Sequence, residues 1–105
     1  MTDKRKLWKP DGTPRYIQCR DAADCGDRYT VWFTGRPPLR NDEWVQYRAM
    51  SEHPFSPQGI GLWGEIERYK LRSYPGGKRI SFADLPDDCR KLVLRDYRDI
   101  WRIKA

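Results

Sequence analysis

Residues 84–102 read DLPDDCRKLVLRDYRDIWR. Asp84 is an acid of the kind that caps helices, a proline follows in the first turn, and Asp87 supplies a second acid. Apolar side chains then recur at helical spacing, at Leu85, Cys89, Leu92, Val93, Tyr97, Ile100 and Trp101. This pattern predicts an amphipathic helix from about residue 85 to residue 102, with one broad buried face.

Charged residues of this helix fall in two places. Asp96 lies inside the apolar sector, and because an unpaired buried carboxylate is very costly, we expect an Arg or a Tyr hydroxyl of the sheet to bind it. Opposite the apolar face, a sector of roughly 60° contains a stripe of four cations, namely Lys91, Arg95, Arg98 and Arg102. The stripe is typical of a surface for phosphates or an acidic partner. It also fits a solvated face in which Asp87 and Asp99 pair with cations four residues away.

Strand signals dominate the rest of the chain. Residues 28–34 (RYTVWFT) are rich in β-branched and aromatic residues and give the clearest strand. Residues 16–20, 43–50 and 78–82 show shorter or alternating patterns, whereas residues 65–74 fit either a helix or a strand. Three to four sequential strands packed by one C-terminal amphipathic helix predict an α+β fold with a small antiparallel meander sheet.

Length and charge bound the class of protein. The 105 residues carry 21 Lys and Arg against 15 Asp and Glu, a formal net charge of +6, and 13% of them are aromatic. This is the size of one domain, and the aromatic content argues against global disorder. No apolar run approaches the ~20 residues of a membrane span. We expect a basic, flexible arm at residues 1–13 and a single α+β domain at residues 14–105.

Cysteine usage and the N-terminus indicate the compartment. Cys19, Cys25 and Cys89 are an odd set, so they cannot all pair within one chain. The N-terminal cations are not followed by the apolar stretch of a secretory signal, which favours a reducing, cytoplasmic location. Five residues separate Cys19 from Cys25, which does not match the close pairs of zinc sites. We therefore expect the cysteines to be small buried hydrophobic residues plus one thiol in a loop, with no metal and no cofactor.

Residues 51–64 (SEHPFSPQGIGLWG) interrupt the strand pattern with prolines and glycines, yet they carry large apolar side chains. Such a loop is usually packed and often functional, and neither a helix nor a central strand is expected to run through it. Its GxGxxG spacing lacks the βαβ frame of a nucleotide-binding turn, so we interpret the glycines as permitting unusual backbone angles. The candidate partner-binding residues here and just beyond are His53, Phe55, Gln58, Trp63 and Glu65.

The arm interleaves cations with an aromatic residue. This combination can hold single-stranded nucleic acid by charge and stacking, although solubilising tails have the same composition. Together with the helical stripe, it supplies the candidates for contact with nucleic acid or an acidic partner, namely Lys4, Arg5, Lys6, Trp8 and Lys9.

These features favour a small non-catalytic binding or accessory module, similar in size and composition to accessory proteins of bacteria and phages. It would engage a protein or nucleoprotein partner through residues 51–64 and a basic surface, since Arg, Trp and Tyr dominate interface energetics. The alternative is direct nucleic-acid binding by the arm and the helical stripe. A third interpretation is a small enzyme centred on His53, but this lone histidine has no nucleophile motif beside it, and no catalytic residue is assigned.

Overall fold

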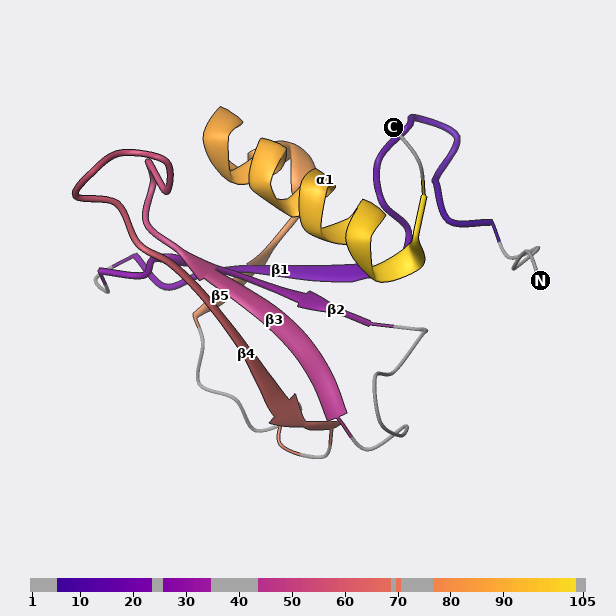
Figure 1. Cartoon of the computed structure of the whole chain (residues 1–105), viewed down its shortest axis with the longest axis horizontal. Helices are drawn as coiled ribbons and strands as arrows, with labels where there is room; N and C mark the ends of the chain where they lie inside the picture. Colours follow the sequence, from indigo (N-terminus) through magenta and orange to yellow (C-terminus); the bar gives the residue numbers. More distant parts are fainter. Residues whose placement is uncertain (1–5, 24–25, 35–43, 69, 71–76, 104–105) are drawn as a thin grey trace.

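One α-helix lies across a twisted antiparallel sheet in the computed structural model of the chain (Figure 1). The structure describes residues 6–23, 26–34, 44–68, 70 and 77–103. These residues form the strands β1 (Ile17–Asp21), β2 (Tyr29–Phe33), β3 (Trp44–Met50), β4 (Gly61–Glu67) and β5 (Lys78–Ile80). A 3-10 turn, η2 (Phe82–Asp84), leads into the helix α1 (Asp87–Trp101). The α+β prediction is confirmed, with five strands in place of three to four.

The strand order is β4-β3-β2-β1-β5, and each neighbouring pair is antiparallel. The first four strands follow one another as the predicted meander. β5 instead returns to the free side of β1, where Arg79 lies opposite Arg20 and Ile80 lies opposite Cys19. This last pairing joins segments that are far apart in the sequence, so no local pattern encodes it.

The core lies between α1 and the sheet, with β2 at its centre. The predicted apolar face of the helix is confirmed, since it packs on alternate residues of the central strands. The buried cluster comprises Cys19, Tyr29, Val31, Phe33, Met50, Leu85, Cys89, Leu92, Val93 and Tyr97. On the opposite face of β2, Trp32 is 1% exposed, so this strand is buried on both sides. The strand with the clearest sequence signal is therefore the middle strand of the sheet.

The helix begins two residues later than expected, because Asp84 belongs to η2. Its carboxylate accepts hydrogen bonds from the backbone N–H and the hydroxyl of Ser81, at 3.1 and 2.9 Å. The capping box therefore forms one turn upstream, and Pro86 is the N-cap of α1. At the other end, Arg102 adopts the left-handed conformation (φ 53°) and terminates the helix.

β4 begins inside the segment that the sequence indicated as a loop. The irregular stretch ends at Ile60, and Gly61 to Gly64 pair with β3 as an edge strand of the described sheet. Edge strands tolerate glycine better than central ones, which explains how the strand passes through this segment. Residues 65–67 continue it, so the strand alternative holds there; residues 69 and 71–76 lie outside the described part.

Two glycines of the GxGxxG segment, Gly59 and Gly64, are at positions where a Cβ would be too close to its neighbours. A Cβ on Gly64 would lie 2.7 Å from the ring of Tyr47, its partner on β3. Of the glycines that the structure describes, Gly12 and Gly77 have positive φ, and none in residues 59–64 does. The interpretation that these glycines permit unusual backbone angles is therefore wrong.

Candidate functional site

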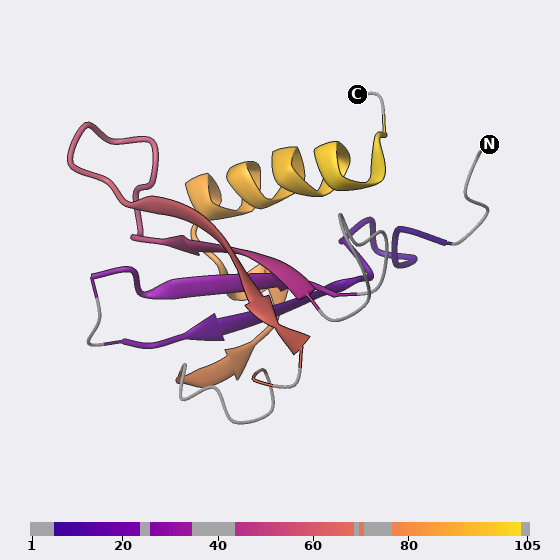
Figure 2. The same cartoon turned by 60° about the horizontal axis from the view of Figure 1, so that its bottom comes forward.

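Residues 51–60 form a loop that is closed at its base. The Ser51 N–H donates to the Ile60 carbonyl (3.0 Å), and the Ile60 N–H donates to the Ser51 hydroxyl (2.9 Å). Within the loop, the Ser56 N–H donates to the His53 carbonyl at 3.1 Å. A Cβ on Gly59 would lie 2.1 Å from the His53 carbonyl oxygen, so only glycine fits where residue 59 passes this carbonyl. The loop is a folded unit that projects past the N-terminal end of α1 (Figure 2).

Cys89 fastens the base of this loop to the helix. Its thiol donates to the Ser51 carbonyl, with 3.2 Å between Sγ and the oxygen. Burial raises the pKa of the Cys89 thiol to about 11, and the charges of Asp88 and Glu52 add to the effect. The thiol is therefore protonated at neutral pH and serves as a hydrogen-bond donor, not as a nucleophile.

Large hydrophobic side chains are exposed in one segment of the described chain. Phe55 in the loop is 51% exposed, and Leu62 and Trp63 at the start of β4 are 57% and 42% exposed. Single exposed apolar residues are common on soluble proteins and carry little information. Here all three lie within residues 55–63, so this segment is the candidate for an interaction surface.

Trp63 rests on a rigid support. It lies opposite Arg48 in the sheet, its ring centroid is 5.6 Å from that of Phe33, and the Arg48 guanidinium carbon is 4.8 Å from its ring. Arg48 itself is held by the Asp96 carboxylate through two hydrogen bonds of 2.8 Å. Of the two partners expected for Asp96, an Arg or a Tyr hydroxyl of the sheet, the structure shows the arginine. The exposed indole is therefore ordered before any partner arrives, which lowers the entropic cost of binding.

The other predicted partner-binding residues lie around this surface. His53 and Gln58 are exposed on the loop, and Glu65 is exposed on β4 opposite Gln46. His53 Nε2 lies 3.4 Å from a carboxylate oxygen of Glu52, and both side chains are mostly exposed. Within the described residues, no hydroxyl is hydrogen-bonded to this imidazole. These exposed side chains offer contacts for a partner, and none of the described residues forms a nucleophile–base pair with His53.

The N-terminal arm packs against the helix in the part that the structure describes. Trp8 meets the ring of Tyr97 edge-on, 5.2 Å between centroids, and the Arg98 guanidinium carbon lies 5.9 Å from the Trp8 ring. The Tyr97 hydroxyl donates to the Leu7 carbonyl and accepts from the Tyr16 N–H. Leu7 and Trp8 thus extend the core beyond the expected boundary at residue 13. Because the Trp8 ring is engaged in this packing, it is not a free platform for a base.

The helical stripe is largely exposed in the structure. Lys91, Arg95 and Arg102 are exposed, and none of them forms a salt bridge with a described carboxylate. The expected pairs Asp87–Lys91 and Arg95–Asp99 do not form; Asp87 pairs with Arg90 instead. The arm and the stripe meet where Trp8 contacts Arg98, while the predicted Lys4 and Arg5 lie outside the described residues.

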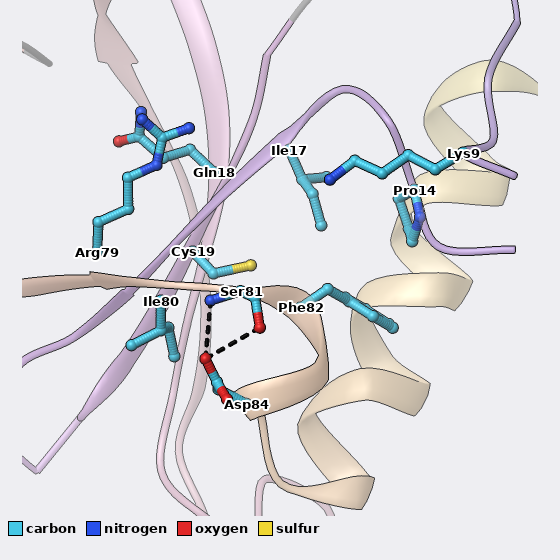
Figure 3. Close-up of a pocket in the computed structure, with 10 residues that line it drawn as sticks. All are labelled: Lys9, Pro14, Ile17, Gln18, Cys19, Arg79, Ile80, Ser81, Phe82 and Asp84. Atoms are coloured by element: carbon cyan, nitrogen blue, oxygen red, sulfur yellow. Dashed lines mark hydrogen bonds between the residues drawn. The ribbon is translucent and has the colours of Figure 1, made fainter. Parts of the chain in front are cut away.

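A pocket that the sequence does not signal opens at the junction of β1, β5 and η2 (Figure 3). Its volume is about 360 Å³, within the range of small-ligand sites. The lining residues come from four separate segments: Lys9, Pro14, Ile17, Gln18, Cys19, Arg79, Ile80, Ser81, Phe82 and Asp84. No local pattern marks the pocket, because it depends on the long-range pairing of β1 with β5. Lys9, predicted as part of the arm, lines this pocket.

Cys19 lies on the floor of the pocket with its thiol neutral. Burial raises the pKa of the thiol to about 12, even though the positive charges of Lys9 and Arg79 lower it. Thiolate chemistry at neutral pH is therefore excluded at this position. Cys19 and Cys89 are the buried small hydrophobes that the sequence predicted, and Cys25 lies outside the described residues.

No group of three or more His, Cys, Asp or Glu residues in the described part of the chain is placed to hold a metal ion. The same part contains no helix that is long and apolar enough to cross a membrane. Comparison with protein-family models, with curated proteins and with solved structures finds no match for this chain. The function is therefore inferred from the surfaces of the molecule.

Proposed function

We propose that the protein is a small non-catalytic binding module of the cytoplasm, of the accessory type found in bacteria and phages. It engages a protein or nucleoprotein partner through residues 51–64 and a basic surface. The observation that carries this proposal is the exposure of Phe55, Leu62 and Trp63 within one short segment. Trp63, supported by Arg48, is of the residue type that contributes most to binding at protein interfaces.

The experiment that tests this proposal compares three forms of the tagged protein in native-cell extract. Phe55→Ser combined with Leu62→Ser removes apolar surface from residues that are more than half exposed, so the fold is expected to persist. Gln58→Ala changes an exposed polar residue of the same loop and is the matched control. Quantitative mass spectrometry of the retained proteins is the readout, and circular dichroism checks that each form is folded.

The expected result is a partner retained by the wild type and by Gln58→Ala and lost by the double variant. Nuclease treatment of the extract then separates a protein partner from a nucleoprotein. Equal retention by all three forms would contradict the role of this surface.

Direct nucleic-acid binding is a second candidate, favoured by the exposed cations of the stripe. Lys91 and Arg95 lie on α1 and Arg102 directly follows it, and none of them has a described carboxylate within salt-bridge distance. Because the Trp8 ring packs on the helix, binding would depend on charge more than on stacking. Replacing the three cations with Gln should weaken binding of labelled oligonucleotides and make it less sensitive to salt. The slope of log affinity against log salt should fall by roughly one for each phosphate that the variant no longer neutralises. Absence of binding by the wild type at low salt would eliminate this candidate.

A further inference from the structure

The two edges of the described sheet are built differently. β5, at one edge, is three residues long and includes Lys78 and Arg79, and short, charged edge strands resist pairing with another chain. β4, at the other edge, pairs with β3 over its full length without a bulge. The first half of β4, with the sequence GLWG, contains neither a proline nor a charged residue and carries the exposed Leu62 and Trp63. Such an edge is prone to pair with a further strand.

The backbone of β4 directs hydrogen-bonding groups towards its free side. The Ser51 N–H donates to the Ile60 carbonyl at 3.0 Å, so these two residues face each other as a hydrogen-bonded pair. Hydrogen-bonded and non-hydrogen-bonded pairs alternate along antiparallel strands. Leu62 therefore bonds to β3, whereas Gly61 and Trp63 direct their N–H and C=O groups away from it. In the described sheet no strand lies on that side of β4 (Figure 1).

Apolar side chains lie on both faces of this half of β4. A Cβ on Gly61 would meet the Leu92 side chain of α1 at 3.6 Å, so residue 61 and, by alternation, Trp63 face the helix. Leu62 points to the opposite face of the sheet. Leu62 is 57% exposed and Trp63 is 42% exposed. A strand added at this edge would therefore cover apolar surface on both faces.

We propose that β4 pairs with β4 of a second copy of the chain, antiparallel about a two-fold axis at Leu62. The inference rests on the proposed function, which it deepens by naming the partner of residues 61–64. In this register Leu62 lies opposite Leu62 of the other copy, and Trp63 lies opposite Gly61 of the other copy. The two pairs of Trp63 with Gly61 are hydrogen-bonded pairs, which exchange N–H···O bonds in both directions. The Gly61 carbonyl accepts from Arg48 at 3.3 Å, and its second lone pair serves the new bond.

Shape and charge favour a second copy in this register. Glycine opposite Trp63 leaves room for the indole, and the two indoles are diagonal neighbours within reach of each other. The Leu62 side chains meet on the other face, so both exposed large hydrophobic residues of β4 are covered. An axis nearer to residue 65 would bring the Glu65 carboxylates of the two copies together, and facing like charges are destabilising. The edge is thus complementary to itself, as a two-fold interface requires, and its small size is typical of a weak dimer.

Analytical ultracentrifugation of the full chain, from about 1 µM to about 1 mM, measures the dimer. Leu62→Lys places two like charges at the axis and is expected to raise the dissociation constant at least about tenfold. Phe55→Lys is the matched control, because it makes the same charge change at a residue that is 51% exposed and lies outside β4. It should change the dissociation constant less than about twofold. Circular dichroism checks that each variant is folded.

Disulfide formation tests the register. Leu62 and Leu62 of the other copy form a non-hydrogen-bonded pair, with about 4.5 Å between their Cα atoms. This spacing suits a disulfide. Leu62→Cys is therefore expected to form a covalent dimer on mild oxidation, with the linkage mapped by mass spectrometry to position 62 of both copies. Phe55→Cys under the same conditions is expected to give no such dimer.

A wild-type dimer that Leu62→Lys weakens and Phe55→Lys does not, with a cross-link at position 62, supports the proposal. A monomer at every concentration, equal effects of the two lysine variants, or a dimer without that cross-link overturns it. The proposed function is decided separately by the extract experiment. A monomeric chain that retains a partner from the extract contradicts only the pairing of β4, whereas a dimer that retains no other protein supports that pairing and contradicts only the proposed function.

Discussion

Arg48 on β3 and Asp96 on α1 form a bidentate ion pair across the interface between sheet and helix. Nε and one terminal nitrogen of the guanidinium each lie 2.8 Å from a carboxylate oxygen. The two side chains are 15% and 6% exposed, so both charges are largely removed from water. A further N–H of Arg48 donates to the Gly61 carbonyl at 3.3 Å, which ties β4 to the same point. The pair thus joins the helix to the part of the sheet that presents Trp63.

Asp96→Asn is expected to lower the free energy of unfolding by about 3–5 kcal/mol, because removal of one member leaves a buried charge unpaired. Asp99→Asn, at an exposed position of the same helix, is the control and should change stability by less than about 0.5 kcal/mol. Urea unfolding followed by far-UV circular dichroism measures both.

The double replacement Arg48→Met with Asp96→Leu should recover much of the stability that Asp96→Asn loses, because apolar residues of similar size can replace a buried ion pair. If Asp96→Asn lowers the free energy of unfolding no more than Asp99→Asn does, the ion pair does not hold the helix to the sheet.

The ion pair also shows what helical periodicity can predict. The helical wheel placed Asp96 in the buried sector, and the cost of a lone carboxylate then required a partner, which narrowed the choice to an Arg or a Tyr of the sheet. Which arginine it would be was not, because this depends on the register that sets Arg48 beside Val31 in the sheet. The strands β1, β2 and β3 were predictable from local patterns of β-branched, aromatic and alternating residues. The pairing of β5 with β1 was not, because it joins segments far apart in the sequence.

Gly64→Ala is expected to destabilise the protein by about 1–3 kcal/mol, the usual cost of forcing an extra group into a packed contact. The added Cβ would lie 2.7 Å from the Tyr47 ring. Gly61→Ala is the matched control on the same strand, since its Cβ would meet the Leu92 side chain at an ordinary 3.6 Å. Thermal unfolding should give a lower midpoint for Gly64→Ala than for Gly61→Ala. Equal midpoints would argue against a steric role for Gly64.

Tyr97→Phe should release the arm from the helix while the rest of the fold persists. The hydroxyl donates to the Leu7 carbonyl and accepts from the Tyr16 N–H, so its loss leaves two backbone groups without this partner. The expected cost is about 1–3 kcal/mol. Hydrogen exchange at Leu7, Trp8 and Tyr16 is expected to accelerate more than exchange in β2. Uniform acceleration across the domain, or none at the arm, would contradict this anchoring role.

The arm and the pocket show why the candidate sites were harder to predict than the fold. Trp8 beside lysines has the composition of a flexible nucleic-acid-binding tail, and nothing local indicates that its ring packs on Tyr97. Residues of the arm, β1 and β5 line one cavity because these three segments come together there. Exposed hydrophobics in residues 55–63 were predictable in part, since a polar linker would not carry Phe55 and Trp63.

The buried thiol of Cys19 should make stability fall at alkaline pH. Burial raises its pKa from the ordinary 9.0 to about 12 in the folded protein. Above pH 9 the unfolded chain loses this proton while the folded chain keeps it, so the unfolded state binds fewer protons and is favoured as the pH rises. The contribution is fully present below pH 9 and is lost as the pH approaches 12.

Cys19→Ala removes this titration and is the variant to compare. The stability advantage of the wild type over Cys19→Ala should therefore shrink by about 1.4 kcal/mol for each pH unit above 9, the free energy of one pKa unit. Urea unfolding of both proteins in reducing buffer at pH 8, 9 and 10 measures it, and the titration of Cys89, tyrosines and lysines cancels in the difference. Parallel stability curves over this range would show that the Cys19 thiol ionises as readily in the folded protein as in the unfolded chain.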